Sequence, residues 1–194
     1  MCGKYDPDIH HRRSIRLEGY DYSQDGLYSV TMCVQGHVCM FGDIVNDQMK
    51  MNEAGIMVST WWGKVGGKFP SVQIDGYIIM PNHFHGIVNV KGQPHGVAPT
   101  SGATGQHRGR SGQPHGVAPT LGDIVNWFKT MTTNEYIRGV KQKGWSPFGG
   151  KLWQRNYYEH IIRSEEELNH VRQYIAENPL NWGTDEENPD VTSG

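Results

Sequence analysis

The sequence of 194 residues predicts a single α+β domain, a ferredoxin-like antiparallel sheet with helices on one face and an added C-terminal helix. Alternating polarity in some segments and helical spacing in others give the order strand, helix, strand, strand, helix, strand, helix. The dipeptide Pro81-Asn82 separates two apolar runs and predicts a tight turn, so the two middle strands form a hairpin. A helix with clear start and stop signals follows the last strand.

The first elements are predicted from the period of their apolar residues. Apolar residues alternate with smaller or polar ones over 28–34, which predicts a half-buried first strand. A helix is expected over about 47–64, followed by the hairpin around Pro81-Asn82. Thr120 and Asp123 resemble an N-cap pair, and the apolar spacing after them predicts a helix to about Val140. Residues 153–162 supply the fourth strand.

The C-terminal helix is expected from Ser164 to Asn178. Ser164 and Glu167 have the spacing of a capping box, and three acidic residues in the first turn oppose the positive end of the helix dipole. Pro179 cannot continue a helix, and it biases Asn178 away from helical geometry. The expected buried stripe of this helix consists of Leu168, Val171 and Ile175.

Two polar side chains share one edge of this helix. Tyr174 and Asn178 lie about 40° apart around the helix axis, on the flank of the buried stripe. A phenol has a pKa of about 10 and is a poor nucleophile unless its electrophile is already polarised. In the simpler interpretation, Tyr174 is an amphipathic residue at the rim of the core and Asn178 is an ordinary residue at a helix C-terminus.

A pair of histidines begins the second strand of the hairpin. Because side chains alternate along a strand, His83 and His85 project to one face while Phe84 and Gly86 point to the other. The pair predicts a divalent-metal site, completed by an oxygen donor such as Asn178. A metal there would polarise a phosphate and stabilise its leaving oxygen. In a chain with ten histidines, such a spacing also arises by chance.

These residues resemble the motifs of the single-tyrosine HUH transposases. The segment from Met80 to His85 is similar to the histidine-hydrophobic-histidine motif, and Tyr174-x-x-x-Asn178-Pro179 resembles the nucleophile helix. Residues 153–163 and 12–22 are further matches, and together the four segments are most similar to the REP-associated tyrosine transposase branch. The resemblance covers about 10–182 and is interrupted by one insert.

The resemblance implies a transposase that cleaves single-stranded DNA beside hairpins. Tyr174 would attack a phosphodiester, leaving a 5′-phosphotyrosine link and a free 3′-hydroxyl. His83 and His85 would bind Mg²⁺ or Mn²⁺. Asn178 would be the third ligand, at a place where better-known relatives have a glutamine, and His160 is the alternative. Relatives include homodimers and monomers, so either state is open.

The domain is expected to span 1–182, with a flexible Gly/Pro-rich insert at about 92–120. The nine residues Gly-Gln-Pro-His-Gly-Val-Ala-Pro-Thr occur at 92–100 and again at 112–120, and the insert contains no acidic residue. A recent duplication explains the repeat, and a basic arm that lies along DNA is the functional alternative. Residues 183–194 are expected to be a disordered acidic tail.

The net charge of −2 is unevenly divided along the chain. Residues 164–194 carry eight acidic groups and one basic group, whereas 1–163 carry 17 basic and 12 acidic groups, a charge of +5. No apolar run approaches the roughly 20 residues of a membrane span, and the N-terminus has no signal-peptide pattern, so a cytoplasmic protein is expected. Arg12, Arg13 and Arg16 form the densest basic cluster, which a solvated terminus and contacts with DNA phosphates explain equally well. The expected phosphate contacts are these three arginines and Arg155.

Other functions stay open at this level. A non-catalytic hairpin DNA- or RNA-binding module, derived from a transposase, would retain binding without cleavage. RNA-recognition modules share the topology, but they stack bases on exposed strand aromatics where this chain has two histidines. Replication initiators and relaxases often carry a second tyrosine or a third histidine in their motif. A metal-dependent hydrolase would give Tyr174 no task.

Overall fold

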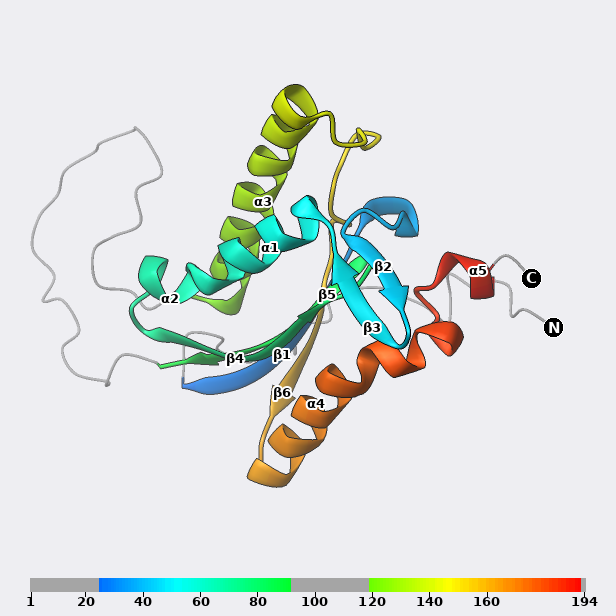
Figure 1. Cartoon of the computed structure of the whole chain (residues 1–194). Helices are drawn as coiled ribbons and strands as arrows, with labels where there is room; N and C mark the ends of the chain where they lie inside the picture. Colours follow the sequence, from blue (N-terminus) through cyan, green and yellow to red (C-terminus); the bar gives the residue numbers. More distant parts are fainter. Residues whose placement is uncertain (1–24, 92–118, 193–194) are drawn as a thin grey trace, which may run out of the picture.

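The computed structural model describes residues 25–91 and 119–192 (Figure 1). Most of the predicted insert lies outside the described residues, as do Arg12, Arg13 and Arg16. The elements follow in chain order as β1 (Gly26–Cys33), η1 (Gln35–His37), β2 (Gly42–Val45), β3 (Gln48–Met51), α1 (Glu53–Gly63), α2 (Val65–Lys68), β4 (Val72–Ile79), β5 (His83–Val90), α3 (Leu121–Lys143), β6 (Tyr158–Ile162), α4 (Glu165–Glu177), η2 (Asn178–Thr184) and α5 (Pro189–Thr192).

Four strands form one antiparallel sheet in the order β4, β5, β1, β6. Helices α1 and α3 lie on one face of this sheet, and α4 lies on the other (Figure 1). With the hairpin of β2 and β3 set aside, the order of strands and helices is that of the ferredoxin-like fold. The predicted fold class is therefore confirmed, including the C-terminal helix added to the sheet.

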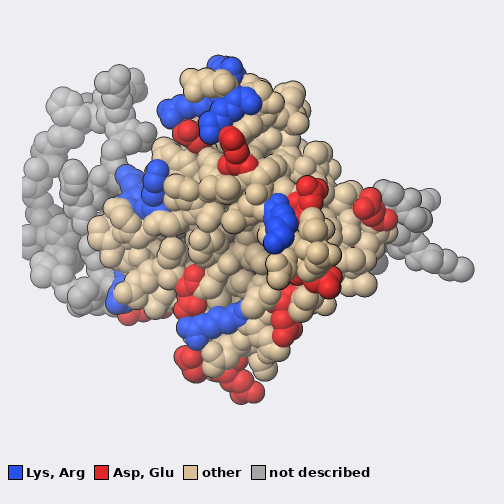
Figure 2. All heavy atoms as spheres, in the orientation of Figure 1, with Lys and Arg blue, Asp and Glu red and all other residues tan. Residues whose placement is uncertain are grey.

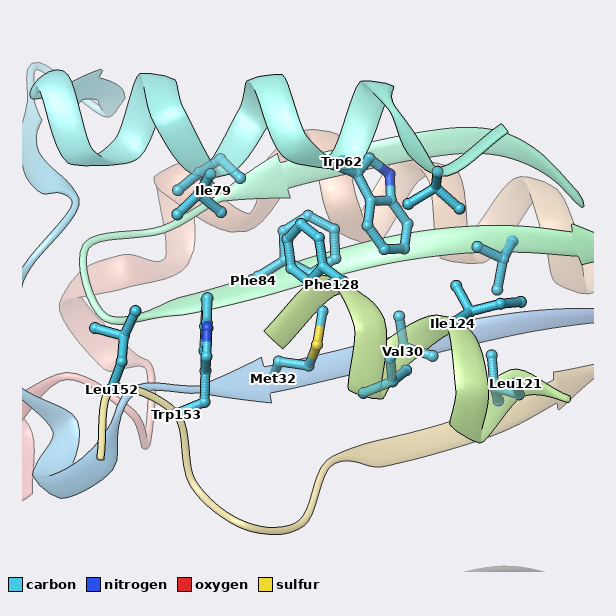
Figure 3. Close-up of a cluster of buried hydrophobic side chains, with 14 of the residues drawn as sticks. Val30, Met32, Trp62, Ile79, Phe84, Leu121, Ile124, Phe128, Leu152 and Trp153 are labelled. Carbon is cyan, nitrogen blue, oxygen red and sulfur yellow. The ribbon is translucent and has the colours of Figure 1, made fainter. Parts of the chain in front are cut away.

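The main core lies between the sheet and helices α1 and α3. Trp62 is fully buried at its centre, with ring centroids 4.5 Å from Phe84 and 5.2 Å from Phe128 (Figure 3). Gly86 leaves room for this indole, because a Cβ at position 86 would come within 2.7 Å of Trp62. The alternation along β5 therefore directs Phe84 into the main core and leaves the two histidines of this strand on the opposite face.

A smaller apolar cluster holds α4 against the sheet. Of the predicted buried stripe, Leu168 and Ile175 are buried and Val171 is partly buried. They pack against the sheet in a cluster that also contains Leu27, Ile78, Ile87 and Ile162. At the edge of the helix, Arg172 donates hydrogen bonds to both carboxylate oxygens of Asp75 in β4, at 3.0 and 2.7 Å. Apolar contacts and an ion pair thus position the helix that carries Tyr174.

The first helix is shorter than the predicted range 47–64. Residues 48–51 pair with 42–45 as a hairpin of β2 and β3, with Asn46 and Asp47 as its two-residue turn. Both have positive φ, at 51° and 58°, as a two-residue hairpin turn requires and as Asn and Asp tolerate. α1 begins only after Asn52, whose side chain accepts a hydrogen bond from the backbone N–H of Gly55 at 2.9 Å.

The last strand covers only the second half of the predicted range 153–162. Trp153 forms a single bridge with Val34. Lys129 of α3 then donates hydrogen bonds to the carbonyls of Gln154 and Asn156, at 3.0 and 2.9 Å. These bonds direct the two carbonyls toward α3 rather than toward a neighbouring strand, so regular pairing begins only in β6.

The two long helices begin where the sequence predicts. Thr120 caps α3 and forms both halves of a capping box with Asp123, and the helix continues to residue 143. Ser164 caps α4 by accepting a hydrogen bond from the backbone N–H of Glu167. The Glu167 carboxylate, however, accepts from the backbone N–H of Arg163 at 2.6 Å, so the second half of this predicted box is made one residue earlier.

The C-terminal end differs from two expectations. Asn178 keeps helical backbone angles (φ −54°, ψ −40°), because Pro179 occupies the first turn of η2, where its missing N–H is not needed. The expected disordered acidic tail is wrong for 183–192: η2 continues to Thr184 and α5 follows. The carbonyl of Glu187 accepts a 2.6 Å hydrogen bond from Asn82, which places this segment beside the histidine strand.

Charge is unevenly distributed on the surface shown in Figure 2. Basic side chains gather at the C-terminal end of α3, where Lys141 and Lys143 lie, and acidic side chains gather near the start of α4. No helix in the described part of the chain is long and apolar enough to cross a membrane.

Candidate metal and nucleophile site

The histidine pair is a rigid part of a central strand. β5 begins at His83, directly after the Pro81-Asn82 turn, and His83 and His85 project to the face of the sheet that carries α4. The ring centroids of His83 and His85 lie 4.7 Å apart, with 79° between the ring planes. Their exposed fractions are 0% and 8%. Both imidazoles are therefore fixed by the strand and largely removed from water.

A hydrogen bond at Nδ1 orients each ring. Nδ1 of His83 lies 2.9 Å from Oδ1 of Asn82, a carbonyl oxygen that can only accept, so the proton is on Nδ1. Nδ1 of His85 lies 2.8 Å from the hydroxyl of Thr31 in β1. Nε2 of both rings is buried without a hydrogen-bond partner. Metal-binding histidines use this arrangement, because a bond at one nitrogen orients the ring and leaves the other free to coordinate.

Asn82 connects the histidine pair to two distant segments. Its Nδ2 donates hydrogen bonds to the backbone carbonyls of His37, at 2.9 Å, and Glu187, at 2.6 Å. These two bonds determine which way the amide points, and so direct Oδ1 toward His83. The sequence predicts Asn82 only as a turn residue, because its partners lie 45 and 105 positions away along the chain.

Burial makes both imidazoles neutral at neutral pH. Burial, together with a smaller effect of the neighbouring His83, lowers the pKa of His85 to about 3. Burial also lowers the pKa of His83, against the effect of the Asp185 carboxylate, whose Oδ2 lies 3.9 Å from Nε2. Neutral imidazole is the form that binds metal ions.

Helix α4 places Tyr174 and Asn178 next to the histidines. The ring centroid of Tyr174 lies 5.3 Å from that of His85, and the phenol is 51% exposed. Asn178 is buried at the end of the same helix. Partial burial raises the pKa of Tyr174, while contact with the Asn178 side chain lowers it. Contact with the Asn178 side chain also raises the pKa of His83, so Asn178 lies near both the phenol of Tyr174 and the imidazole of His83.

The donor atoms fit a divalent cation such as Mg²⁺ or Mn²⁺. Nε2 of His83, Nε2 of His85 and Oδ1 of Asn178 are all buried without a partner. Within the described residues, no group of three His, Cys, Asp or Glu side chains could hold a metal, so a third protein ligand would be of another type, such as a carboxamide. The alternative third ligand, His160, instead bonds through Nε2 to Glu167 at 2.5 Å.

The C-terminal segment adds residues that the sequence interpretation did not include. The indole of Trp182 in η2 lies with its ring centroid 6.0 Å from that of His83. Asp185 follows, with its carboxylate near the same imidazole. Only the course of the chain after α4 reveals these neighbours, since neither residue has a characteristic spacing from the histidines. The predicted DNA contact Arg155 is exposed in the loop before β6.

The chain resembles known proteins in sequence and in fold. No family model matches it. It is 39% identical to an uncharacterized protein of Haemophilus influenzae over 189 residues, which are 96% of this chain and 98% of that protein. Its structure is similar to that of a REP-associated tyrosine transposase bound to a REP hairpin, with a TM-score of 0.53 and 15% identity over 86% of this chain and 74% of that one. At 15% identity, the similarity to the REP-associated tyrosine transposase shows a common fold.

Proposed function

We propose, from the premise that this chain belongs to one family with the Haemophilus influenzae protein and shares the fold of a REP-associated tyrosine transposase, that it is a single-tyrosine HUH transposase. In this proposal it cleaves single-stranded DNA at hairpin, REP-like sequences and rejoins the strands. The supporting observation is the position of the Tyr174 phenol, whose ring centroid lies 5.3 Å from that of His85, beside three buried donor atoms without partners.

The proposed reaction uses Tyr174 as the nucleophile. Its phenolic oxygen attacks the scissile phosphorus, and the bond from phosphorus to the 3′ oxygen breaks. The products are a 5′-phosphotyrosine ester and a free 3′-hydroxyl, and the leaving oxygen gains a proton as the phenol loses one. Because the pKa of Tyr174 is raised by burial, the phenol is protonated at neutral pH, and its proton has to leave during the attack. The exposed half of the phenol is open to a DNA phosphate.

The histidine pair and Asn178 would hold Mg²⁺ or Mn²⁺ in this proposal. When bound, the ion polarises the phosphate and stabilises the charge on the leaving oxygen. The residues of the chain prepare the site: Asn82 and Thr31 orient the two imidazoles, and burial keeps them neutral.

The nucleophile is tested by the variant Tyr174→Phe. Protein is incubated with labelled single-stranded hairpin oligonucleotides and Mn²⁺, and covalent adducts are separated on a denaturing gel. The variant should bind hairpins but form no adduct. Tyr77→Phe is the control, because this tyrosine packs against Trp62 and Phe84 on the other face of the sheet. An adduct in Tyr174→Phe would refute the assignment, and a wild type that binds hairpins without ever forming one would favour the non-catalytic binding module.

The metal site is tested by His83→Ala and His85→Ala. Each variant should lose metal-dependent cleavage, and EDTA should stop cleavage by the wild type. Calorimetric titration with Mn²⁺ measures binding independently of activity. Each variant should bind Mn²⁺ at least tenfold more weakly, because loss of a residue that only orients a metal ligand already weakens binding by about tenfold or more. Undiminished cleavage in EDTA would reject the metal role.

A further inference from the structure

A cavity of about 390 Å³ lies between α4 and the sheet, next to the proposed active site. β1, β5 and β6 form one side of it, and α4 forms the other. Besides apolar residues, its lining includes Ser29, Thr31, His85, His160, His170 and Tyr174. His85 and Tyr174 belong to the proposed active site and Thr31 orients His85, whereas Ser29 and His170 have no role in the proposed reaction.

The cavity follows from the residues that β1 presents to α4. Tyr28, Val30 and Met32 belong to the main core, so Ser29 and Thr31 face the helix. These short polar side chains cannot fill the space below α4. The space below α4 is therefore left unfilled, and because it is partly open to solvent a ligand can enter it.

The lining has the chemistry of a site for a flat heterocycle. Val171 and Ile175 supply apolar surface, and imidazole rings supply polar edges. The His160 ring is held by its 2.5 Å hydrogen bond to Glu167, and in the neutral ring the other nitrogen is an acceptor. The volume is at the lower end of the range of about 300–1,000 Å³ found for small-molecule sites.

The charges of the lining favour a base over a phosphate. No lysine or arginine occurs among the described residues that line the cavity, and the Glu167 carboxylate is part of it. Away from His85 and Tyr174, a phosphate in the cavity would meet no lysine or arginine and would be repelled by Glu167. A neutral nucleobase can instead pack between apolar and aromatic side chains, as bases do in single-strand sites.

We propose that this cavity binds one nucleobase of the DNA strand, from a nucleotide adjacent to the scissile phosphate. The inference rests on the proposed function, because it takes the strand to be the substrate of Tyr174. Since Tyr174 lines the cavity, a base within it belongs to a nucleotide whose phosphate can reach the phenol. The cavity thereby selects the base next to the cleavage position, independently of how the hairpin itself is recognised.

The test couples a change in the protein to a change in the DNA. Ser29→Leu fills the cavity from the sheet side and leaves the histidines, Tyr174 and Asn178 in place. Thr130→Leu is the control, because Thr130 is exposed on α3, on the other face of the sheet. Each protein is titrated with hairpin oligonucleotides in which one nucleotide near the cleavage site is replaced by an abasic residue. Affinity is measured by fluorescence anisotropy, and the rate of adduct formation is measured on gels.

One abasic position should weaken binding or adduct formation by the wild type by about tenfold, the order of magnitude of one base-stacking contact. Ser29→Leu should show this loss with the intact oligonucleotide and no further loss at that abasic position, whereas Thr130→Leu should behave as the wild type. If adducts form but the loss from Ser29→Leu and the loss from the abasic nucleotide multiply, the cavity does not bind that base. A wild type that forms adducts but is insensitive to every abasic position would also overturn the cavity assignment. A wild type that neither binds hairpins nor forms adducts would overturn the proposed function as well.

If circular dichroism shows that Ser29→Leu is unfolded, His170→Ala provides the same test from the helix side. His170 is exposed on α4, so its removal leaves the cores intact. The sensitivity to the abasic position should then be reduced relative to the wild type. An unchanged sensitivity in His170→Ala, measured on folded protein, would count against the proposal.

Discussion

Replacement of Asn82 by alanine should weaken both the fold and the affinity for a divalent cation. The side chain is fully buried and bonds to three groups: Nδ1 of His83 at 2.9 Å and the carbonyls of His37 and Glu187 at 2.9 and 2.6 Å. Alanine leaves all three groups without this partner. It also removes the oxygen that keeps the proton of His83 on Nδ1, and with it the orientation of the ring.

The expected loss of unfolding free energy is about 2–4 kcal/mol. A buried polar group left without its partner costs about 1–3 kcal/mol. Water that enters the vacated space can form hydrogen bonds with some of these three groups, so their costs do not add in full. Loss of a residue that orients a metal-binding histidine typically weakens metal affinity about 10- to 100-fold. Mn²⁺ binding should therefore weaken by about 1.4–2.7 kcal/mol.

Denaturant unfolding with and without Mn²⁺ measures both quantities, because an ion that binds only the folded state adds to its stability. The control is Asn181→Ala, at an exposed asparagine of η2, which should change the stability by no more than about 0.5 kcal/mol. Suppose that Asn82→Ala unfolds at the same denaturant concentration as the wild type and gains as much stability from Mn²⁺. Asn82 then does not orient His83, and the argument from the hydrogen bonds is wrong.

Three further changes test packing and electrostatics. Gly86→Ala should destabilise the fold by about 1–3 kcal/mol, because the added Cβ would lie 2.7 Å from Trp62; a thermal melt at the wild-type temperature would contradict this. Burial lowers the pKa of Lys129 to about 8, below its unfolded value of 10.5, so between these values the unfolded chain binds a proton that the folded chain lacks. The wild type should therefore gain stability relative to Lys129→Met as the pH rises from 8 to 10, and a constant difference in denaturant unfolding would refute the assignment. Arg172→Ala should cost less than about 1 kcal/mol, since the side chains of Arg172 and Asp75 are 41% and 31% exposed; a coupling above about 2 kcal/mol in a double-mutant cycle with Asp75→Asn would contradict this.

The elements that the sequence predicted well depend on residues close together in the chain. Alternation along β5 is sufficient to place His83 and His85 on one face and Phe84 on the other. The caps at Thr120 and Ser164 are likewise local, because each side chain bonds to a backbone group three residues away. For the same reason, the predicted starts of α3 and α4 are correct.

The predictions that failed have two different causes. At Asn46 and Asp47 a local signal was present, since these residue types adopt the positive φ of a two-residue turn, but the helix expected over 47–64 was extended across it. The acidic segment gave no such signal. Its composition favours a solvated tail, and the contact between Asn82 and Glu187 that fixes its course joins positions 105 residues apart.

The sequence by itself determined which face of each strand and helix carries the chemistry, because these faces follow from the periods of the two structures. Only the tertiary structure decided that the Tyr174 phenol comes next to His85 and that Asn82 orients His83. Those contacts depend on how α4 packs on the sheet through a small apolar cluster and on where the chain goes afterwards. Such packing depends on all the elements together, so it cannot be predicted from any short segment of the sequence.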